Sequence, residues 1–308
     1  MTQETWFVFN PISGVLSPSR KQALLRFIEA QPGARLVFTQ RAGHGTELAS
    51  QAAREGVRAV VAIGGDGTVN EVARGLLGSQ VALGIVPVGS GNGLARQLRL
   101  PLGIDASVRF ALQPVEPQAM DVGFLNDVPF FCTAGLGFDA WVAHAYARRA
   151  GRGLTTYVRA TARTLWQYRP ERCRFLTSGP DGTVAQPEEV DVFSLTFANA
   201  GQYGNDAWIA PEARLDDGLL DVALLRPFPK THAIVMSRRL FRGQLATSPY
   251  YSLRRGREFR IETDAPLLLH YDGEPLVLPE TSLHVRLQPG ALRVLAPAFG
   301  RGRRAASR

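Results

Sequence analysis

Cysteine is almost absent from the 308-residue sequence, which contains only Cys132 and Cys173. Two cysteines are too few for a disulfide framework, and neither has a second Cys or His at a metal-ligand spacing. The five histidines show no paired spacing such as H-x-x-x-H. We therefore expect core thiols and no zinc-type site.

Long hydrophobic runs are also lacking. No stretch approaches 18 apolar residues without a charge, and the first residues, 1–6, include Glu4 and no basic segment. A membrane-spanning helix and a signal peptide are both unexpected on these grounds. The sequence predicts a soluble, cytoplasmic protein.

Acidic residues are fewer than basic ones: the sequence has 27 Asp and Glu against 35 Lys and Arg, which gives a formal net charge of +8. Arginine supplies most of the excess and suits phosphate recognition, so nucleic acid, anionic lipid headgroups and a polyphosphate substrate all fit as partners. No helix-turn-helix, zinc-finger or RNP-like signature is present, which argues against nucleic acid. Residues 299–308 form a basic tail that we expect to be disordered.

The first third of the chain alternates short apolar runs with amphipathic stretches, and the chain is long enough for two domains. Ser17 followed by Pro18 predicts a helix start, Thr46 predicts the cap of a helix ending before Gly56, and 70–77 is helical in pattern. Alternation of this kind implies a parallel sheet covered on both faces. The predicted strands are 6–9, 35–38, 57–63 and 81–88.

The pattern changes after a connector at 113–118, which contains Pro114 and Pro117. Beyond it the chain is strand-rich, with one helical stretch at 140–168. We therefore expect an α/β domain at 1–120 and a mainly antiparallel β domain at 121–298. The predicted strands of the second domain are 121–133, 175–176, 190–199, 219–225, 258–263, 266–271 and 282–287.

Three glycine-rich loops follow predicted strands, at 10–14, 64–71 and 87–95. Glycine lets backbone N–H groups turn toward an anion, and a helix opening near Thr68 offers its positive end. Loops that leave the carboxyl ends of neighbouring parallel strands converge on one crevice, so the three indicate one nucleotide site. No Walker lysine motif and no dinucleotide fingerprint accompanies them.

These loops resemble the catalytic motifs of diacylglycerol kinases, sphingosine kinases and their bacterial relatives. The Gly-Gly-Asp-Gly-Thr element at 64–68 is also shared with phosphofructokinases and NAD kinases. Further matching motifs lie at 121–123, 133–139, 199–203, 211–221 and 272–274. The resemblance spans residues 6 to about 296. It implies an α/β ATP-binding domain like those of phosphofructokinase and NAD kinase, a β-sandwich lipid domain, and ATP bound between them.

The resemblance also implies which residues bind the nucleotide, and which lipids to consider. Asn92-Gly93 stands where bacterial diacylglycerol kinases usually have Asn-Asp, and the loop is closer to sphingosine and long-chain-base kinases, so both acceptors stay open. The residues expected to line ATP are Asn10, Pro11, Ser13, Gly14, Thr39, Gly65, Asp66, Gly67, Thr68, Val69, Asn70, Glu71, Ser90 and Asn92.

Carboxylates are the remaining chemical candidates, because phosphoryl transfer needs charge neutralisation and an acceptor for the hydroxyl proton. Asp66, Asp272 and Glu274 are the candidates for catalysis, with Glu274, or Asp272, as base. In the family, the loop matching 214–219 holds a structural Mg²⁺. Its implied ligands are Asp217 and the carbonyls of Arg214 and Leu219, with Asp216 in an outer or water-mediated position.

We interpret the chain as an ATP- and Mg²⁺-dependent lipid kinase acting at a membrane surface through peripheral contact. The arginine-rich segment 148–174, with interleaved aromatics, is a candidate for that contact, although a solvated helical face explains it equally well. The alternatives are a kinase of a soluble acceptor such as NAD or a sugar phosphate, and a nucleotide-binding protein without turnover. The sequence leaves a homodimer open.

Overall fold

The computed structural model describes residues 4–12, 16–148, 154–178 and 187–299, and the chain divides into two compact units. Unit 1 comprises Met1–Asp121 and Pro289–Gly300, whereas the described part of unit 2 lies within Val122–Gln288. The expected continuous second domain, 121–298, therefore differs from the structure. The reason is the last strand, β16 (Ser282–Val294), whose Val294 pairs with Leu83 of unit 1. The expected tail lies outside the described residues from position 300 on.

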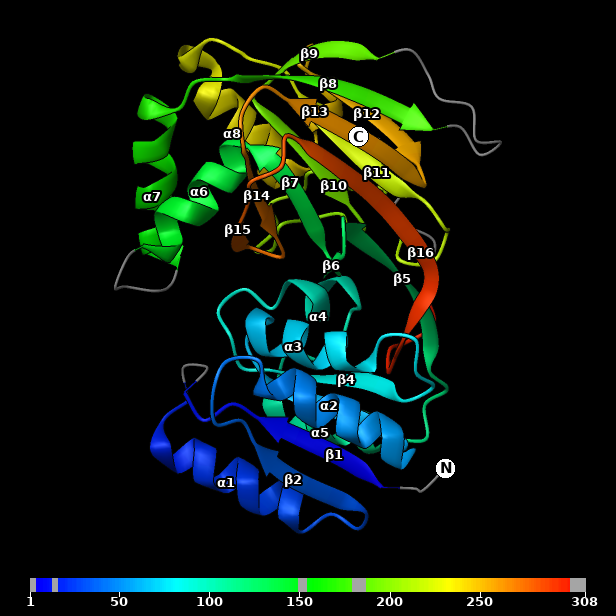
Figure 1. Ribbon diagram of the computed structural model, residues 1–308. Helices are drawn as coiled ribbons and strands as arrows, with labels where there is room; N and C mark the ends of the chain where they lie inside the picture. The colour runs from blue at the N-terminus through cyan, green and yellow to red at the C-terminus, as the bar shows by residue number, and fades with distance from the viewer. Residues whose placement is uncertain (1–3, 13–15, 149–153, 179–186, 300–308) are drawn as a thin grey trace. The chain divides into compact units, whose positions relative to one another are not determined.

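A parallel sheet forms the centre of unit 1, as predicted. Its order is β2-β1-β3-β4, and the end of β16 adds to β4 in parallel (Figure 1). All residues of β1, β3 and β4 are buried, which explains their nearly continuous apolar sequences. The strands are β1 (Thr5–Phe9), β2 (Ala34–Phe38), β3 (Ala59–Gly64) and β4 (Ala82–Pro87).

Helices cover both faces of this sheet (Figure 1). Leu24 and Ile28 of α1 and Val108 and Ala111 of α5 pack with strand side chains in one core cluster. On the other face, α2 and α3 pack against each other. The helices of unit 1 are α1 (Pro18–Glu29), α2 (His44–Glu55), α3 (Asp66–Leu76), α4 (Gly93–Gln97) and α5 (Ile104–Leu112).

The predicted start of α1 is confirmed, whereas α2 and α3 begin at other residues than the sequence predicted. The Ser17 side chain accepts a hydrogen bond from Arg20 N, so Ser17 is the predicted cap of α1. Thr46 was the wrong cap for α2: the helix begins at His44, and the Thr46 hydroxyl instead donates to the Glu71 carbonyl. α3 begins at Asp66, two residues before the predicted opening.

Unit 2 is an antiparallel β-sandwich, which confirms the predicted fold class. One sheet has six strands in the order β12-β11-β10-β7-β14-β15, all antiparallel. Its strands are β7 (Thr133–Gly137), β10 (Ser194–Ala198), β11 (Leu220–Leu225), β12 (Tyr251–Gly256), β14 (Leu267–Tyr271) and β15 (Glu274–Leu278). The sequence analysis missed β12 and β15, whose residues are mostly half-exposed and therefore lack a clear apolar run.

The facing layer of unit 2 has the order β16-β13-β8-β9, with β5 pairing β16 and β6 pairing β5. Alternate side chains of the two layers form one hydrophobic core, including Phe130, Phe197 and Phe259. Its strands besides β16 are β5 (Gln118–Leu125), β6 (Val128–Phe130), β8 (Glu171–Ser178), β9 (Glu188–Val192) and β13 (Glu258–Thr263).

The predicted helical stretch 140–168 is two helices, α6 (Phe138–Ala147) and α7 (Leu154–Gln167), with 149–153 outside the described residues. A third helix, α8 (Ala233–Arg242), was not predicted and lies between the short helices η1 (Lys230–His232) and η2 (Leu245–Thr247). No helix within the described residues is long and apolar enough to cross a membrane. Of the two expected core thiols, Cys173 is buried and Cys132 is half-buried.

Candidate functional site

The three glycine-rich loops of unit 1 leave the carboxyl ends of adjacent parallel strands, as expected. Asn10 N donates to the Ile63 carbonyl at the end of β3, and Val88 N donates to the Gly64 carbonyl. The Asn10 amide also donates to the Thr68 hydroxyl, at 3.2 Å, which joins the first loop to α3. The described parts of these loops therefore form one connected surface at the edge of the sheet.

The second and third loops touch backbone to backbone at Gly65 and Gly89. A Cβ on Gly89 would lie 2.6 Å from the Gly65 Cα, a distance that real side chains do not reach. Gly65 is also the N-cap of α3, so the helix begins at this contact. The first N–H groups of a helix have no partner within the helix and carry its positive end, which makes this point suitable for a phosphate.

Asp66 fixes the third loop through both carboxylate oxygens. Oδ1 accepts from Gly93 N at 2.7 Å, and Oδ2 accepts from Asn92 N at 3.0 Å. Burial raises the pKa of Asp66 above its ordinary value, while these two N–H groups and the Arg96 charge act to lower it. Asn92 completes the turn in a left-handed conformation, φ 53°, with its side-chain amide bonded to both backbone groups of Gly89.

Glu71 has a comparable role on the opposite side of α3. Its two oxygens accept from Gly43 N at 2.8 Å and Gly45 N at 3.0 Å, so it holds the start of α2. The carboxylate is thus engaged with backbone and lies half-buried. Thr39 is buried after β2, where its N–H donates to the Phe9 carbonyl.

The other predicted nucleotide residues fall into distinct settings. Pro11, Gly67 and Ser90 are exposed and accessible to a ligand, whereas Val69 and Asn70 are buried in α3. The predicted Ser13 and Gly14 lie outside the described residues. A residue that the sequence analysis missed is Lys21 of α1, whose Nζ donates to the Pro11 carbonyl at 2.9 Å and brings a positive charge to the first loop. It is one of only two lysines in the chain, which was the available signal.

In unit 2, Asp272 lies in the turn between β14 and β15, and its carboxylate binds the backbone of the β6–β7 connection. Its Oδ2 accepts from Phe131 N at 2.9 Å, and its Oδ1 accepts from Cys132 N at 2.7 Å and Thr133 N at 3.2 Å. The residue adopts φ 49°, the left-handed conformation of a tight turn. Glu274, two residues on, is exposed at the start of β15, and its side chain makes no hydrogen bond or ion pair with any described residue. The two carboxylates of the 272–274 turn therefore differ: Asp272 accepts three backbone hydrogen bonds, and the side chain of Glu274 accepts none from a described residue.

A partly buried polar cluster near the 272–274 turn was not among the predicted site residues. Asp139 Oδ2 accepts from the hydroxyls of Thr196 at 2.9 Å and Tyr203 at 3.0 Å, and lies 3.0 Å from His270 Nε2. His270 lies on β14, two residues before Asp272. The cluster therefore joins α6 to the strand that leads into the 272–274 turn. His270 had no distinguishing sequence signal, because it is a lone histidine without a paired spacing.

The expected magnesium loop contains carboxylates that already have protein partners. Asp217 Oδ1 accepts from Leu219 N at 3.1 Å, and Oδ2 lies 3.3 Å from Arg255 Nη2. Both oxygens of Asp216 accept from Arg214, each at 3.1 Å, which leaves Asp216 poorly placed as an outer ligand. No group of three or more His, Cys, Asp or Glu with metal-binding geometry occurs among the described residues. The donor types still fit Mg²⁺, since Asp217 and two backbone carbonyls are hard oxygen ligands.

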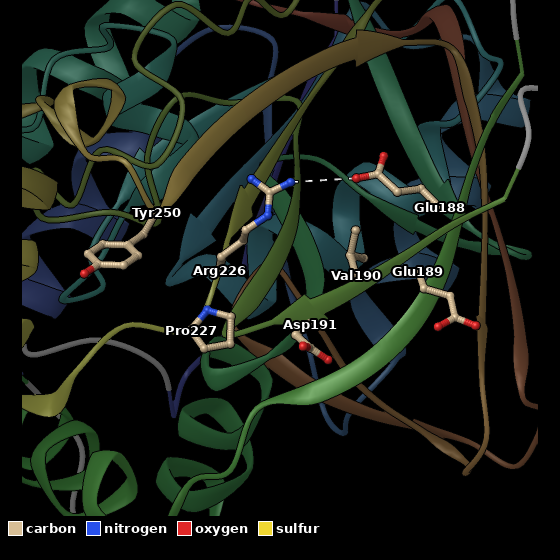
Figure 2. A pocket seen from close by; sticks show the side chains of 7 residues that line it. All are labelled: Glu188, Glu189, Val190, Asp191, Arg226, Pro227 and Tyr250. Atoms are coloured by element: carbon tan, nitrogen blue, oxygen red, sulfur yellow. Dashed lines mark ion pairs between the residues drawn. The ribbon is translucent and has the colours of Figure 1, made fainter.

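A surface pocket of about 470 Å³ on unit 2 is lined by none of the predicted site residues (Figure 2). Glu188, Glu189 and Asp191 contribute three carboxylates, and Arg226 forms an ion pair with Glu188 at 3.7 Å. Three carboxylates around one cation repel a polyphosphate. This pocket is therefore unsuitable for ATP.

Two family models match the chain in sequence. The diacylglycerol kinase catalytic domain matches residues 4–125, and the YegS C-terminal NAD kinase beta sandwich-like domain matches residues 132–296. The two matches together cover almost all of the described structure and divide it near the boundary between the units.

Individual relatives agree with these models. A protein of Chromohalobacter salexigens named "Probable lipid kinase YegS-like" is 32% identical over 96% of this chain and 93% of its own length. A "Diacylglycerol kinase" of Mycobacterium tuberculosis is 28% identical over 82% of this chain and 81% of its own. The crystal structure of a diacylglycerol kinase from Bacillus anthracis superposes with a TM-score of 0.74 at 18% identity, covering 96% of this chain and 97% of that one, which shows the same fold.

Proposed function

The chain belongs to the family of YegS-like lipid kinases and diacylglycerol kinases, and from that premise we propose that it transfers the γ-phosphate of ATP to a hydroxyl group of a lipid. The observation that supports this proposal is the meeting of three glycine-rich loops at the positive end of α3. Diacylglycerol and a sphingoid or other long-chain base are the candidate acceptors. Kinases of soluble acceptors share the Gly-Gly-Asp-Gly-Thr element, but the relative named "Probable lipid kinase YegS-like" matches 96% of this chain and favours a lipid.

In this proposal the loops bind and orient the phosphates. The first turn of α3 and the glycine backbone supply N–H donors, and Asp66 keeps the third loop in place through Asn92 and Gly93. Phosphoryl transfer is catalysed mainly by such positioning and by charge neutralisation, so rigid loops are what the reaction needs. Thr39, Thr68 and the other expected ATP contacts remain predictions.

The acceptor hydroxyl must lose its proton, and we assign that step to Glu274. Its side chain is exposed and makes no hydrogen bond or ion pair with a described residue, whereas the Asp272 carboxylate accepts hydrogen bonds from three backbone N–H groups. Asp272 therefore acts as a positioning residue that fixes the turn leading to Glu274. Asp139 of α6 supports the same turn through His270, which lies on β14 just before it.

Mg²⁺ is the proposed metal cofactor, and it supplies neutralisation of the phosphate charge when it accompanies ATP. A second, structural Mg²⁺ would be held by Asp217 with the carbonyls of Arg214 and Leu219. We expect 5 mM MgCl₂ to raise the thermal midpoint of the wild-type protein, because a ligand bound only by the folded state stabilises it by about 2.7 kcal/mol at one hundred times its Kd. Asp217→Asn should remove this rise, measured by differential scanning fluorimetry.

The control is Asp216→Asn, which removes a neighbouring carboxylate that is paired with Arg214. This variant should keep the Mg²⁺-dependent rise. Equal midpoints for the wild type with and without Mg²⁺ would show that Asp217 belongs to an ordinary turn closed by its bond to Leu219 N.

The function itself is tested with a lipid panel. Purified protein, labelled ATP and Mg²⁺ are incubated with diacylglycerol, sphingosine, ceramide and monoacylglycerol in mixed detergent micelles, and in parallel with NAD and fructose 6-phosphate. We expect label in at least one lipid. Label in NAD or the sugar phosphate with none in any lipid would replace the proposed function by a soluble-acceptor kinase.

A kinase of this type must reach its acceptor at a membrane surface. In the part of the segment 148–174 that the structure describes, Arg148 caps the end of α6, and α7 and the start of β8 follow. Arg159, Arg163 and Trp166 are exposed at helical spacing on α7, which supports the segment as one point of peripheral contact.

A further inference from the structure

The unpredicted helix α8 has an outer side that is both apolar and basic. Ile234, Val235 and Phe241 are 68%, 46% and 54% exposed, and Arg238 and Arg242 are exposed beside them. Residues 234, 238 and 241, and likewise residues 235, 238 and 242, are spaced by one and two helical turns. All five therefore lie on one side of the helix, which we call the α8 face. The opposite side attaches the helix to unit 2 through Met236 and Leu240.

The charge on this segment has one sign. Residues 227–249 contain Lys230, Arg238, Arg239 and Arg242 and no Asp or Glu. Neither Arg238 nor Arg242 makes an ion pair with any described residue. The α8 face therefore presents apolar side chains beside two arginines that form no ion pair with a described residue.

An exposed tryptophan contacts the short helix η1, which directly precedes α8. Lys230 Nζ, at the start of η1, donates to the Trp166 carbonyl at 2.8 Å and lies 5.6 Å from the centre of the Trp166 ring. The Trp166 side chain is 72% exposed. Tryptophan beside lysine or arginine is typical of the boundary between lipid headgroups and acyl chains.

We propose that the α8 face is a docking surface for an anionic lipid bilayer, with α8 lying in the plane of the headgroups. Ile234, Val235 and Phe241 would enter the acyl boundary while Arg238 and Arg242 contact lipid phosphates. The proposal rests on the proposed function, because a lipid kinase must hold a position at the surface where its acceptor lies. It assigns that contact to a helix outside the arginine-rich segment 148–174.

A second copy of the chain is a poorer occupant for this face. In a two-fold dimer the same patch meets itself, so Arg238 and Arg242 would approach the cations of the partner with no carboxylate between them. An anionic bilayer instead satisfies the cations and the apolar side chains at the same time.

The test measures binding to vesicles without ATP or lipid acceptor. Wild type, Ile234→Ser/Phe241→Ser and Arg238→Gln/Arg242→Gln are sedimented with phosphatidylcholine vesicles containing 0 or 30% phosphatidylglycerol. We expect wild type to bind the anionic vesicles and each double variant to bind at least tenfold more weakly, about 1.4 kcal/mol. Raising NaCl to 0.5 M should release the wild type, because surface attraction is screened.

Matched controls carry the same chemical changes on unit 1. Leu102→Ser removes an apolar side chain that is 44% exposed, and Arg26→Gln/Arg54→Gln removes two exposed cations. Both should bind vesicles like the wild type. Thermal midpoints within about 2 °C of wild type would show that the surface substitutions leave the fold intact, as is usual for exposed positions.

Two readouts separate failure of this inference from failure of the proposed function. The α8 variants should keep the wild-type rate on lipid dissolved in detergent micelles, where no bilayer must be bound. Wild-type lipid phosphorylation with unchanged vesicle binding by both double variants would overturn the α8 assignment alone. Vesicle binding that depends on the α8 face, without phosphorylation of any lipid, would overturn the kinase function alone.

A wild-type dimer that becomes monomeric in Ile234→Ser/Phe241→Ser, with unchanged vesicle binding, would make the face a contact between copies.

Discussion

Replacing Glu274 by Gln is expected to slow phosphoryl transfer by roughly 10² to 10⁴ while the protein binds ATP and unfolds like wild type. Glutamine keeps the length and hydrogen-bonding reach of the side chain but cannot accept the hydroxyl proton. The exposed carboxylate makes no hydrogen bond or ion pair with a described residue, so its loss should leave the turn and β15 unchanged. The measurement is kcat on the preferred lipid in mixed micelles, together with ATP affinity and the thermal midpoint.

Asp272→Asn is the matched comparison, because it makes the same chemical change two residues away. An asparagine at 272 has one acceptor oxygen where the aspartate accepts three N–H groups, from Phe131, Cys132 and Thr133. Unpaired backbone groups cost about 1 to 3 kcal/mol each where they are buried, so this variant should lose stability as well as rate. A wild-type rate for Glu274→Gln with a large loss for a still-folded Asp272→Asn would move the role of base to Asp272.

The fold was largely predictable because its strands are buried in continuous apolar runs. Strands β1, β3 and β4 of the parallel sheet were found for this reason, as were buried strands of the sandwich such as β10 and β11. The edge strand β2 is only partly buried and was found from its short β-branched and aromatic run. The failures occur where this signal weakens: β12 and β15 are half-exposed, and α8 buries only Met236. The end of β16 could not be assigned from sequence, since its pairing with β4 depends on contacts between residues more than 200 positions apart.

The site was predictable in its loops but less so in the use of its carboxylates. Glycine spacing identified the turns, yet an aspartate in a turn has the same sequence signature whether it binds a metal or its own backbone. The structure distinguishes the two candidates of the 272–274 turn, because Asp272 faces three N–H groups and Glu274 faces none. The Asp139 cluster depends on long-range pairing of α6, β10 and β14, which no local pattern reveals.

Asp66→Ala is expected to lower turnover at least tenfold. Turnover should fall below detection if the third glycine-rich loop, 87–95, moves away from α3. The carboxylate is the shared acceptor for the N–H groups of Asn92 and Gly93, and alanine leaves both without it. The loop that approaches Gly65 through Gly89 would then be free to move away from the phosphates. ATP affinity should fall together with kcat, in contrast to Glu274→Gln, because positioning of the phosphates affects binding as well as chemistry.

The free energy of unfolding should change little in Asp66→Ala, because burial of the Asp66 carboxyl group opposes the gain from its hydrogen bonds. Burial raises the pKa of Asp66 in the folded protein, so the stability linked to its protonation is present below the unfolded pKa, about 3.9, and is lost as the pH rises through the folded value. At pH 7.5 the variant removes a carboxyl group whose burial is unfavourable together with its two hydrogen bonds, and these effects oppose each other. Circular dichroism at pH 7.5 should therefore give a midpoint within a few degrees of wild type. More than about a tenth of the wild-type rate in a folded Asp66→Ala would reduce Asp66 to an ordinary turn residue, since a tenfold loss corresponds to only about 1.4 kcal/mol of transition-state stabilisation.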